Sequence, residues 1–215
     1  MLSTIDEITI DHNNIKYLFV EYKKQSKTDD DIRAKIVNTL IREIAIHSEA
    51  EEATVYRSLA KQDQSIADHF RQEHQELEQV LYSLDYTKIS DPEFEPQFEK
   101  AVQMFLKHST EEEQGQLATL SKTLPLEDND KLAKSFLDYR NLVPTRPHPS
   151  APQDGGVIHK ALGTVTRGHD KVMEMLSGRE FVKLKFTHPA NGPVEPLKVD
   201  NQVLSDLHPA TEVET

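Results

Sequence analysis

The chain contains no cysteine, so disulfide bonds, cysteine-ligated zinc sites, iron–sulfur clusters and cysteine nucleophiles are excluded. Positive charge is also scarce. Twenty-five Lys and Arg face 37 Asp and Glu, which leaves a formal net charge of −12. Nucleic acids and anionic membranes attract basic surfaces, and we therefore expect neither as a partner.

Long apolar runs and targeting signals are missing as well. No apolar stretch approaches the roughly 20 residues that a membrane-spanning helix needs. The acidic start, Met1 to Glu7, lacks the basic and apolar regions of a signal peptide. We expect a cytoplasmic protein. Its 215 residues, of which 36% are hydrophobic, suffice for one domain with an appendage.

Residues 1–90 contain neither glycine nor proline, the two residues that most strongly interrupt regular structure. Apolar residues recur at helical spacing up to about residue 124. The pattern predicts a first helix around residues 8–22, then helices over about 29–61, 64–84 and 93–123. Short connections would fold these four helices into an antiparallel up-down bundle, an all-α fold.

The chain changes character after residue 125. We predict a bundle domain over 1–125, a helical extension over 126–177 with a Pro-rich linker at 144–154, and an irregular tail over 178–215. Helices are expected at 128–143 and 157–176, and the linker should be extended. Residues 183–186 are a candidate short strand. The tail is expected to wrap the bundle, contact a partner or be disordered.

The sequence also contains an internal repeat. His-Ser-x-x-Glu-Glu occurs at 47–52 and at 108–113, and a leucine follows each histidine by twelve residues. Two further histidines, His12 and His74, are separated by 62 residues, close to the 61 that separate His47 and His108. The chain therefore reads as two helical hairpins of one design.

Histidine and glutamate four residues apart lie on one helix face and can bind one metal ion or two adjacent ions. That spacing alone is weak evidence, because five histidines have Glu four residues later. A histidine that lies on the apolar face of its helix is a more specific indication of a metal ligand than the spacing alone. Each predicted helix has one such histidine: His12, His47, His74 and His108. His69, about 140° round the helix from His74, should point elsewhere.

Glu51 lies on the same apolar helix face as His47, and Glu112 lies on the same face as His108, so both glutamates should point into the predicted core. An ionised glutamate there is costly unless it is paired or metal-bound, and a metal pair in the bundle explains all six residues together. A lone histidine in a core is more often hydrogen-bonded than metal-bound, but four such histidines together with two glutamates favour metal ligation.

Other residues near these six are interpreted without a direct role in metal binding. Glu52 and Glu113 are interpreted as solvated or supporting residues, Glu49, Glu76 and Glu111 as surface charges, and Tyr17, Tyr22 and Tyr56 as core-edge aromatics with outward hydroxyls rather than groups beside the metals.

The order His, His-x-x-x-Glu, His, His-x-x-x-Glu resembles the hemerythrin-like (HHE cation-binding) domain over about residues 5–124. His12 within Ile10-Asp11-His12 and the two His-Ser-x-x-Glu-Glu segments carry the resemblance. It implies a four-helix bundle with two non-haem iron ions bridged by Glu51 and Glu112. His12 and His47 would serve one ion, and His74 and His108 the other.

One position departs from the oxygen-carrying members, which place a further histidine four residues after the third-helix histidine. Here that residue is Glu78, which either adds a carboxylate ligand or is solvated, with water in its place. Harder oxygen ligands favour higher oxidation states and also suit manganese. Simple reversible oxygen carriage is therefore less favoured than oxidation, peroxide chemistry or iron sensing.

The resemblance implies a di-iron protein that binds or senses dioxygen, nitric oxide or iron. The alternative is a di-iron oxidase or oxygenase acting on a small organic substrate, so the enzymatic status stays open. A metal-free helical interaction module is disfavoured, because like charges would remain in its core. Residues 126–215 could close a pocket, mediate homodimerisation or recognise a protein partner.

Overall fold

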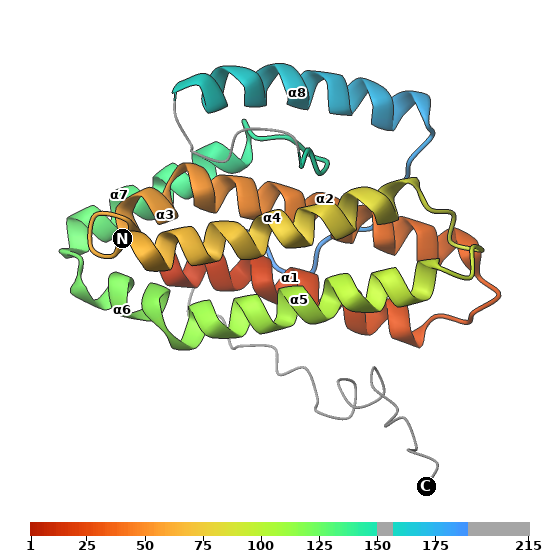
Figure 1. The fold of residues 1–215 in the computed structure, drawn as a ribbon, viewed down its shortest axis with the longest axis horizontal. Helices are drawn as coiled ribbons and strands as arrows, with labels where there is room; N and C mark the ends of the chain where they lie inside the picture. The colour runs from red at the N-terminus through yellow and green to blue at the C-terminus, as the bar shows by residue number, and fades with distance from the viewer. Residues whose placement is uncertain (150–156, 189–215) are drawn as a thin grey trace, which may run out of the picture.

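The computed structural model describes residues 1–149 and 157–188. Four long helices lie side by side and form an antiparallel bundle (Figure 1): α1 (Thr4–Lys24), α2 (Asp30–Ala53), α4 (Gln64–Tyr86) and α5 (Phe94–Gln114). The side chain of Asp29 caps α2 by accepting a hydrogen bond from the backbone N–H of Ile32. The all-α prediction is confirmed, and the described residues contain no strand.

Two of the predicted helices are interrupted. The helix predicted over 29–61 breaks at Thr54 and continues as α3 (Val55–Leu59). The helix predicted over 93–123 breaks at Gly115 and continues as α6 (Gln116–Thr123). The predictions of unbroken helices were therefore wrong at both places. The two breaks fall at equivalent positions of the internal repeat, 61 residues apart.

Each break has a local cause. The hydroxyl of Thr54 donates a 2.6 Å hydrogen bond to the carbonyl oxygen of Ala50, a bond that is known to bend helices. At Gly115, a Cβ atom would lie only 2.5 Å from the carbonyl oxygen of Glu111. The backbone path after α5 therefore requires a residue without a side chain.

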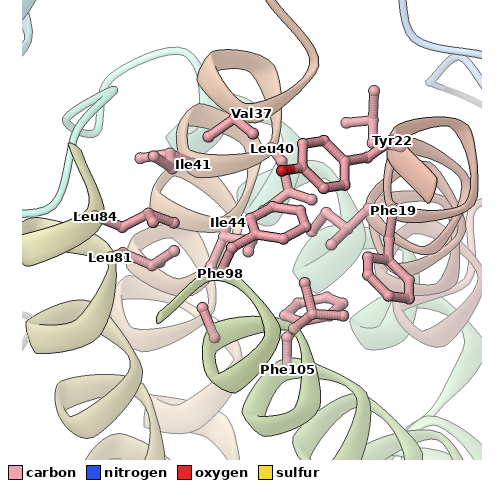
Figure 2. Packing of buried hydrophobic residues seen from close by; sticks show 14 of the residues in the cluster. Phe19, Tyr22, Val37, Leu40, Ile41, Ile44, Leu81, Leu84, Phe98 and Phe105 are labelled. Carbon is pink, nitrogen blue, oxygen red and sulfur yellow. The ribbon is translucent and has the colours of Figure 1, made fainter. Parts of the chain in front are cut away.

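Two hydrophobic clusters fill the bundle, one toward each end. The first includes Phe19, Leu40, Leu81 and Phe98 (Figure 2). The second includes Ile8, Tyr56, Phe70, Leu120 and Phe136. On each of the four long helices, the histidine of the apolar stripe lies in the sequence between residues of the two clusters. The histidines therefore share one level of the bundle, with apolar layers on both sides.

The extension packs against the bundle. Helix α7 (Leu126–Arg140) lies against α1 and α2, and α8 (Val157–Leu176) runs alongside the bundle (Figure 1). Residues 143–149, which we call the strap, lie between α8 and the bundle and are largely buried. The described part of the predicted linker is therefore a packed segment and not a spacer in solvent.

The described part of the predicted tail, residues 178–188, also follows the bundle surface. The strand predicted at 183–186 does not form, because this backbone bonds to side chains and not to another strand. Asn14 exchanges two hydrogen bonds with the backbone of Phe186, and the N–H of Val182 donates to the hydroxyl of Thr39. Predictions for 150–156 and 189–215 lie outside the described residues. No helix within the described ranges has both the length and the apolar character to span a membrane.

Candidate metal centre

The four long helices bring the four predicted histidines together in two facing pairs. His12 of α1 and His47 of α2 have their Nε2 atoms 3.1 Å apart. His74 of α4 and His108 of α5 have theirs 2.8 Å apart. All four residues are buried, with at most 2% of their surface exposed. Each pair thus presents two imidazole nitrogens to one point in the core.

Glu51 and Glu112 lie between the two pairs and are fully buried. The Oε2 atom of Glu51 is 3.2 Å from Nε2 of His47 and 3.6 Å from Nε2 of His74. The Oε2 atom of Glu112 is 3.4 Å from Nε2 of both His12 and His108. Each carboxylate therefore contacts one histidine of each pair, as a carboxylate shared between two ions must.

The potential ligand atoms form two overlapping groups. His12, His47, Glu51 and Glu112 make one group, and Glu51, His74 and His108 make the other; within each group the atoms lie within 4.8 Å of one another. Glu78 belongs to neither group. Its Oε1 atom instead accepts a 2.6 Å hydrogen bond from the backbone N–H of His148 in the strap. Six of the seven predicted site residues therefore converge, and Glu78 lies beside them.

A ring of four carboxylates surrounds the histidines. The Nδ1 atoms lie 2.8 Å from Glu113 for His12, 3.4 Å from Asp11 for His47, 3.1 Å from Glu52 for His74 and 2.9 Å from Glu73 for His108. Each carboxylate adjoins a site residue of its own helix in the sequence and reaches the histidine of the next helix, so the ring closes around the bundle. An ionised carboxylate only accepts, so Asp11, Glu73 and Glu113, whose pKa values are lowered by their hydrogen-bond partners and nearby positive charges, hold the proton on Nδ1 and turn the Nε2 lone pair inward. Burial and Glu49 instead raise the pKa of Glu52.

Sequence reasoning identified half of this ring. Glu52 and Glu113 were considered as supporting residues, whereas Asp11 and Glu73 were missed. Their adjacency to His12 and His74 was the available signal. The interpretation of Glu49 as a surface charge was wrong, because it is buried. Glu76 and Glu111 are exposed, and the side chain of His69 is 54% exposed, as the helical geometry predicted.

Tyr56 occupies the middle of the site, which contradicts the expectation of an outward hydroxyl. Its hydroxyl donates to Oε1 of Glu112 at 2.6 Å and also lies 3.1 Å from Oε2 of Glu51. The same oxygen is 3.1 Å from Nε2 of His74 and 3.3 Å from Nε2 of His108. Tyr56 is therefore a polar neighbour of one histidine pair and of both shared carboxylates.

The other two tyrosines lie away from the centre. Tyr22 belongs to the first hydrophobic cluster, and its hydroxyl donates a 2.8 Å hydrogen bond to Glu95. The ring of Tyr17 contacts the ammonium group of Lys185, whose Nζ is 4.5 Å from the ring centre. These two residues fix the fold around the site and do not touch the candidate ligands.

Burial and mutual charge set the protonation of the site. Burial lowers the pKa of His47 to about 4 and, together with His108, lowers the pKa of His74 well below its usual value. Burial and the neighbouring Glu112 raise the pKa of Glu51 well above its usual value. For Glu112, His108 and His12 lower the pKa against the effect of burial. His47 and His74 are therefore held in the neutral form that binds a metal, whereas Glu112 and Glu113 raise the pKa of His12 against the effect of burial.

The residues present fit a pair of metal ions. Oε1 of Glu51 and Oε2 of Glu112 are buried, and neither accepts a hydrogen bond from any residue that the structure describes. The facing Nε2 lone pairs likewise need a positive charge between them. Leaving such acceptors buried without a partner is costly, and a bound cation removes that cost. Four imidazoles and two carboxylates suit first-row divalent ions such as iron or manganese.

Comparison with known proteins agrees with this geometry. The family model for the hemerythrin HHE cation binding domain matches residues 3–120, a range that contains all six converging residues. An uncharacterised hemerythrin-like protein of Schizosaccharomyces pombe is 32% identical over 151 residues, which cover 68% of this chain and 73% of that protein. No solved structure matches. The chain therefore belongs to the hemerythrin HHE cation-binding family.

Proposed function

We propose that the chain holds two non-haem iron ions and binds or senses dioxygen, nitric oxide or iron itself. The contact of Glu51 and Glu112 with one histidine of each pair carries the proposal. His12 and His47 would hold one ion, and His74 and His108 the other. When bound, a ferrous pair supplies two electrons and an open coordination position to a small ligand.

The protein's own part is to orient donors and to exclude water. The carboxylate ring fixes each imidazole, which keeps its inward nitrogen free of a proton. The ring of Phe105 packs edge-on against His12 and His47, with centroids 5.6 and 6.0 Å away. The ring of Phe70 does the same for His108 at 5.5 Å. These aromatic walls lower the local polarity and strengthen every charge interaction inside the site.

The hollows in the structure support a small ligand. The hollow that reaches His74 has a volume of about 10 Å³, roughly the room that one water molecule needs. A larger hollow of about 550 Å³ lies beside α3 and α7, and none of the six converging residues lines it. This distribution supports binding or sensing of a diatomic molecule or an ion over oxidation of an organic substrate.

Metal content and the visible spectrum, measured on one sample, test the proposal. The full chain would be loaded with ferrous iron without oxygen and then exposed to air. We expect about two irons per chain, as in other di-iron bundles, and new absorption between the near-ultraviolet and the green. Manganese would be loaded in parallel to compare the two ions.

The fate of the new absorption separates the two functions. Reversal under vacuum supports binding or sensing, whereas permanent conversion supports the oxidase or oxygenase. A variant with both His47→Ala and His108→Ala should bind no stoichiometric iron. A folded wild-type protein without stoichiometric metal would overturn the proposal.

A further inference from the structure

A narrow hollow between α2 and α4 ends at a candidate metal ligand. Ser48, Glu49 and Glu52 line it from α2, and His74 and Glu78 from α4. Burial increases along it: Ser48 and Glu78 are half-buried, whereas Glu49, Glu52 and His74 are 7%, 3% and 2% exposed. The hollow therefore leads from near the protein surface toward the metal centre.

The strap closes this hollow. Pro147 completes its lining from the outside. The guanidinium of Arg146 donates to Asp85 of α4 from Nε at 2.8 Å, and the backbone N–H of Thr145 donates to Asp170 of α8 at 2.9 Å. These bonds hold the residues on the N-terminal side of Pro147 to α4 and α8.

The residue after Pro147 is anchored as well. The backbone N–H of His148 donates to Glu78 at 2.6 Å, and its ring nitrogen Nε2 lies 2.9 Å from Oδ1 of Asp170. The strap thus contacts the wall of the hollow directly. At about 10 Å³, the hollow has room for roughly one water molecule and none for an ion with its coordinated waters. A hydrated ion therefore requires the strap to move before it can pass along this hollow.

The walls are suited to a cation. Glu49, Glu52 and Glu78 contribute three carboxyl groups, and no lysine or arginine occurs among the described residues that line the hollow. A low-dielectric cleft with charges of one sign concentrates ions of the opposite sign, whereas it does not attract neutral diatomic molecules. The innermost carboxyl group, that of Glu52, has its Oε1 atom 3.1 Å from Nδ1 of His74.

We propose that this hollow is the loading route for the divalent metal ions and that the strap, through Pro147, is its gate. The inference rests on the metal-binding function proposed above. It concerns the rates at which ions enter and leave the centre and not the equilibrium affinity. Opening a gate lowers the barrier for entry and for exit of the ion equally, so it should leave the dissociation constant unchanged.

The test measures metal exchange in the full chain after metal removal by chelation. Cobalt(II) alone is the probe: uptake is followed by its visible absorption after rapid mixing, and release by adding excess chelator. Pro147→Ala should accelerate both uptake and release severalfold at unchanged stoichiometry. Arg146→Gln frees the strap from Asp85 without altering the lining of the hollow, and it should act in the same direction.

Charge is tested separately from size. Glu49→Gln keeps the shape of the wall but removes one carboxylate, so uptake should slow and its dependence on salt concentration should weaken. Glu76→Gln, an exposed change on α4, is the matched control and should leave both rates unchanged. Pro149→Ala, in the same strap but not among the residues that line the hollow, should also leave them unchanged.

Hydrogen exchange provides a readout that does not involve metal. Arg146→Gln should accelerate exchange of the His148 amide, which is hydrogen-bonded in the closed strap. If Pro147→Ala does not fold, Arg146→Gln carries the test alone. Unchanged cobalt rates in folded variants with a freely exchanging strap would overturn the gate, as would equal acceleration by Pro149→Ala. A wild-type protein that binds no metal at equilibrium would instead overturn the proposed function.

Discussion

The hydroxyl of Tyr56 donates a 2.6 Å hydrogen bond to Oε1 of Glu112 at the centre of the bundle. The same hydroxyl oxygen lies 3.1 Å from Oε2 of Glu51, and the tyrosine is fully buried. Tyr56 therefore contacts both carboxyl groups that lie between the two histidine pairs, and it supplies a hydrogen-bond donor to Glu112. Its removal would leave a buried acceptor without that donor.

Tyr56→Phe should destabilise the chelator-treated protein by about 1–3 kcal/mol, the cost of leaving a buried polar group unsatisfied. Urea unfolding measures the change. The control is Tyr82→Phe, whose side chain is partly exposed on α4 and should shift stability by less than about 0.5 kcal/mol. Equal unfolding midpoints for Tyr56→Phe and wild type would contradict the role assigned to this hydroxyl.

Glu51→Gln should have opposite effects on metal content and on stability. Burial and Glu112 raise the pKa of Glu51, so this group costs the folded chain stability at pH values above its unfolded pKa of about 4.3. A neutral amide removes that cost, and the chelator-treated variant should be more stable than wild type at pH 8. Iron content should fall at both halves of the centre. Retention of full iron content would exclude a shared role, and the exposed Glu111→Gln serves as the control.

Glu73→Gln tests the carboxylate ring. Glu73 accepts a 2.9 Å hydrogen bond from Nδ1 of His108 and so orients that ring. Carboxylates that support a metal-bound histidine typically contribute about 10–100-fold in metal affinity, and we expect a loss of that size. Competition with a chelator measures it. Glu76→Gln on the same helix should bind metal like wild type; comparable losses in both variants would point to a general effect of charge.

Gly115→Ala tests the helix break that follows Glu112. The added Cβ would lie 2.5 Å from the carbonyl oxygen of Glu111, so the backbone must shift. We expect a loss of about 1–3 kcal/mol in stability, typical of overpacking, together with weaker metal binding. Gly168→Ala in α8 meets open space and should gain up to about 1 kcal/mol from helix propensity. Thermal unfolding with and without iron distinguishes the two substitutions.

His188 should make stability depend on pH. Its ring nitrogens lie 2.8 Å from Glu7 and 2.7 Å from Asp11. Hydrogen bonding and charge from Asp11 and Glu7 raise its pKa, while burial and Arg140 oppose the rise. A histidine with a raised pKa stabilises the fold fully below its unfolded pKa of about 6.5, and that contribution is lost as pH rises through the folded value.

The stability difference between wild type and His188→Gln should therefore be larger at pH 6 than at pH 9. Urea unfolding of chelator-treated protein at both pH values measures it. His169→Gln, a change on the exposed part of α8, should stay within about 0.5 kcal/mol of wild type at both. A difference that grows from pH 6 to pH 9 would show that the His188 contacts do not favour its charged form.

Much of the metal centre could be predicted from the sequence because helical geometry is local. The 100° turn per residue places His47 and Glu51 on one face wherever the helix is packed. The same rule places His12, His74, His108 and Glu112 in apolar stripes. The structure brings these six residues together, and three of the helices that carry them, α2, α4 and α5, begin within one residue of the predicted start, although α2 and α5 end early, at Ala53 and Gln114.

Tyr56 could not be predicted in this way. On an unbroken helix it would lie about 140° round from Glu51 and would point away from the site. The break at Thr54 changes the path of the chain, so that Tyr56 enters the core beside Glu112. The break depends on a side-chain hydrogen bond of Thr54 and on packing, and neither appears in the apolar pattern.

Sequence by itself thus determined the all-α bundle, the repeat and the faces that carry the six converging residues, because these follow from spacing along one helix. Only the tertiary structure decided which carboxylate reaches which imidazole, since the partners Asp11 and His47 lie 36 residues apart, and Glu113 and His12 lie 101 apart. It also decided that Glu78 bonds to the strap. Such contacts depend on the register between helices, which packing sets and local spacing does not encode.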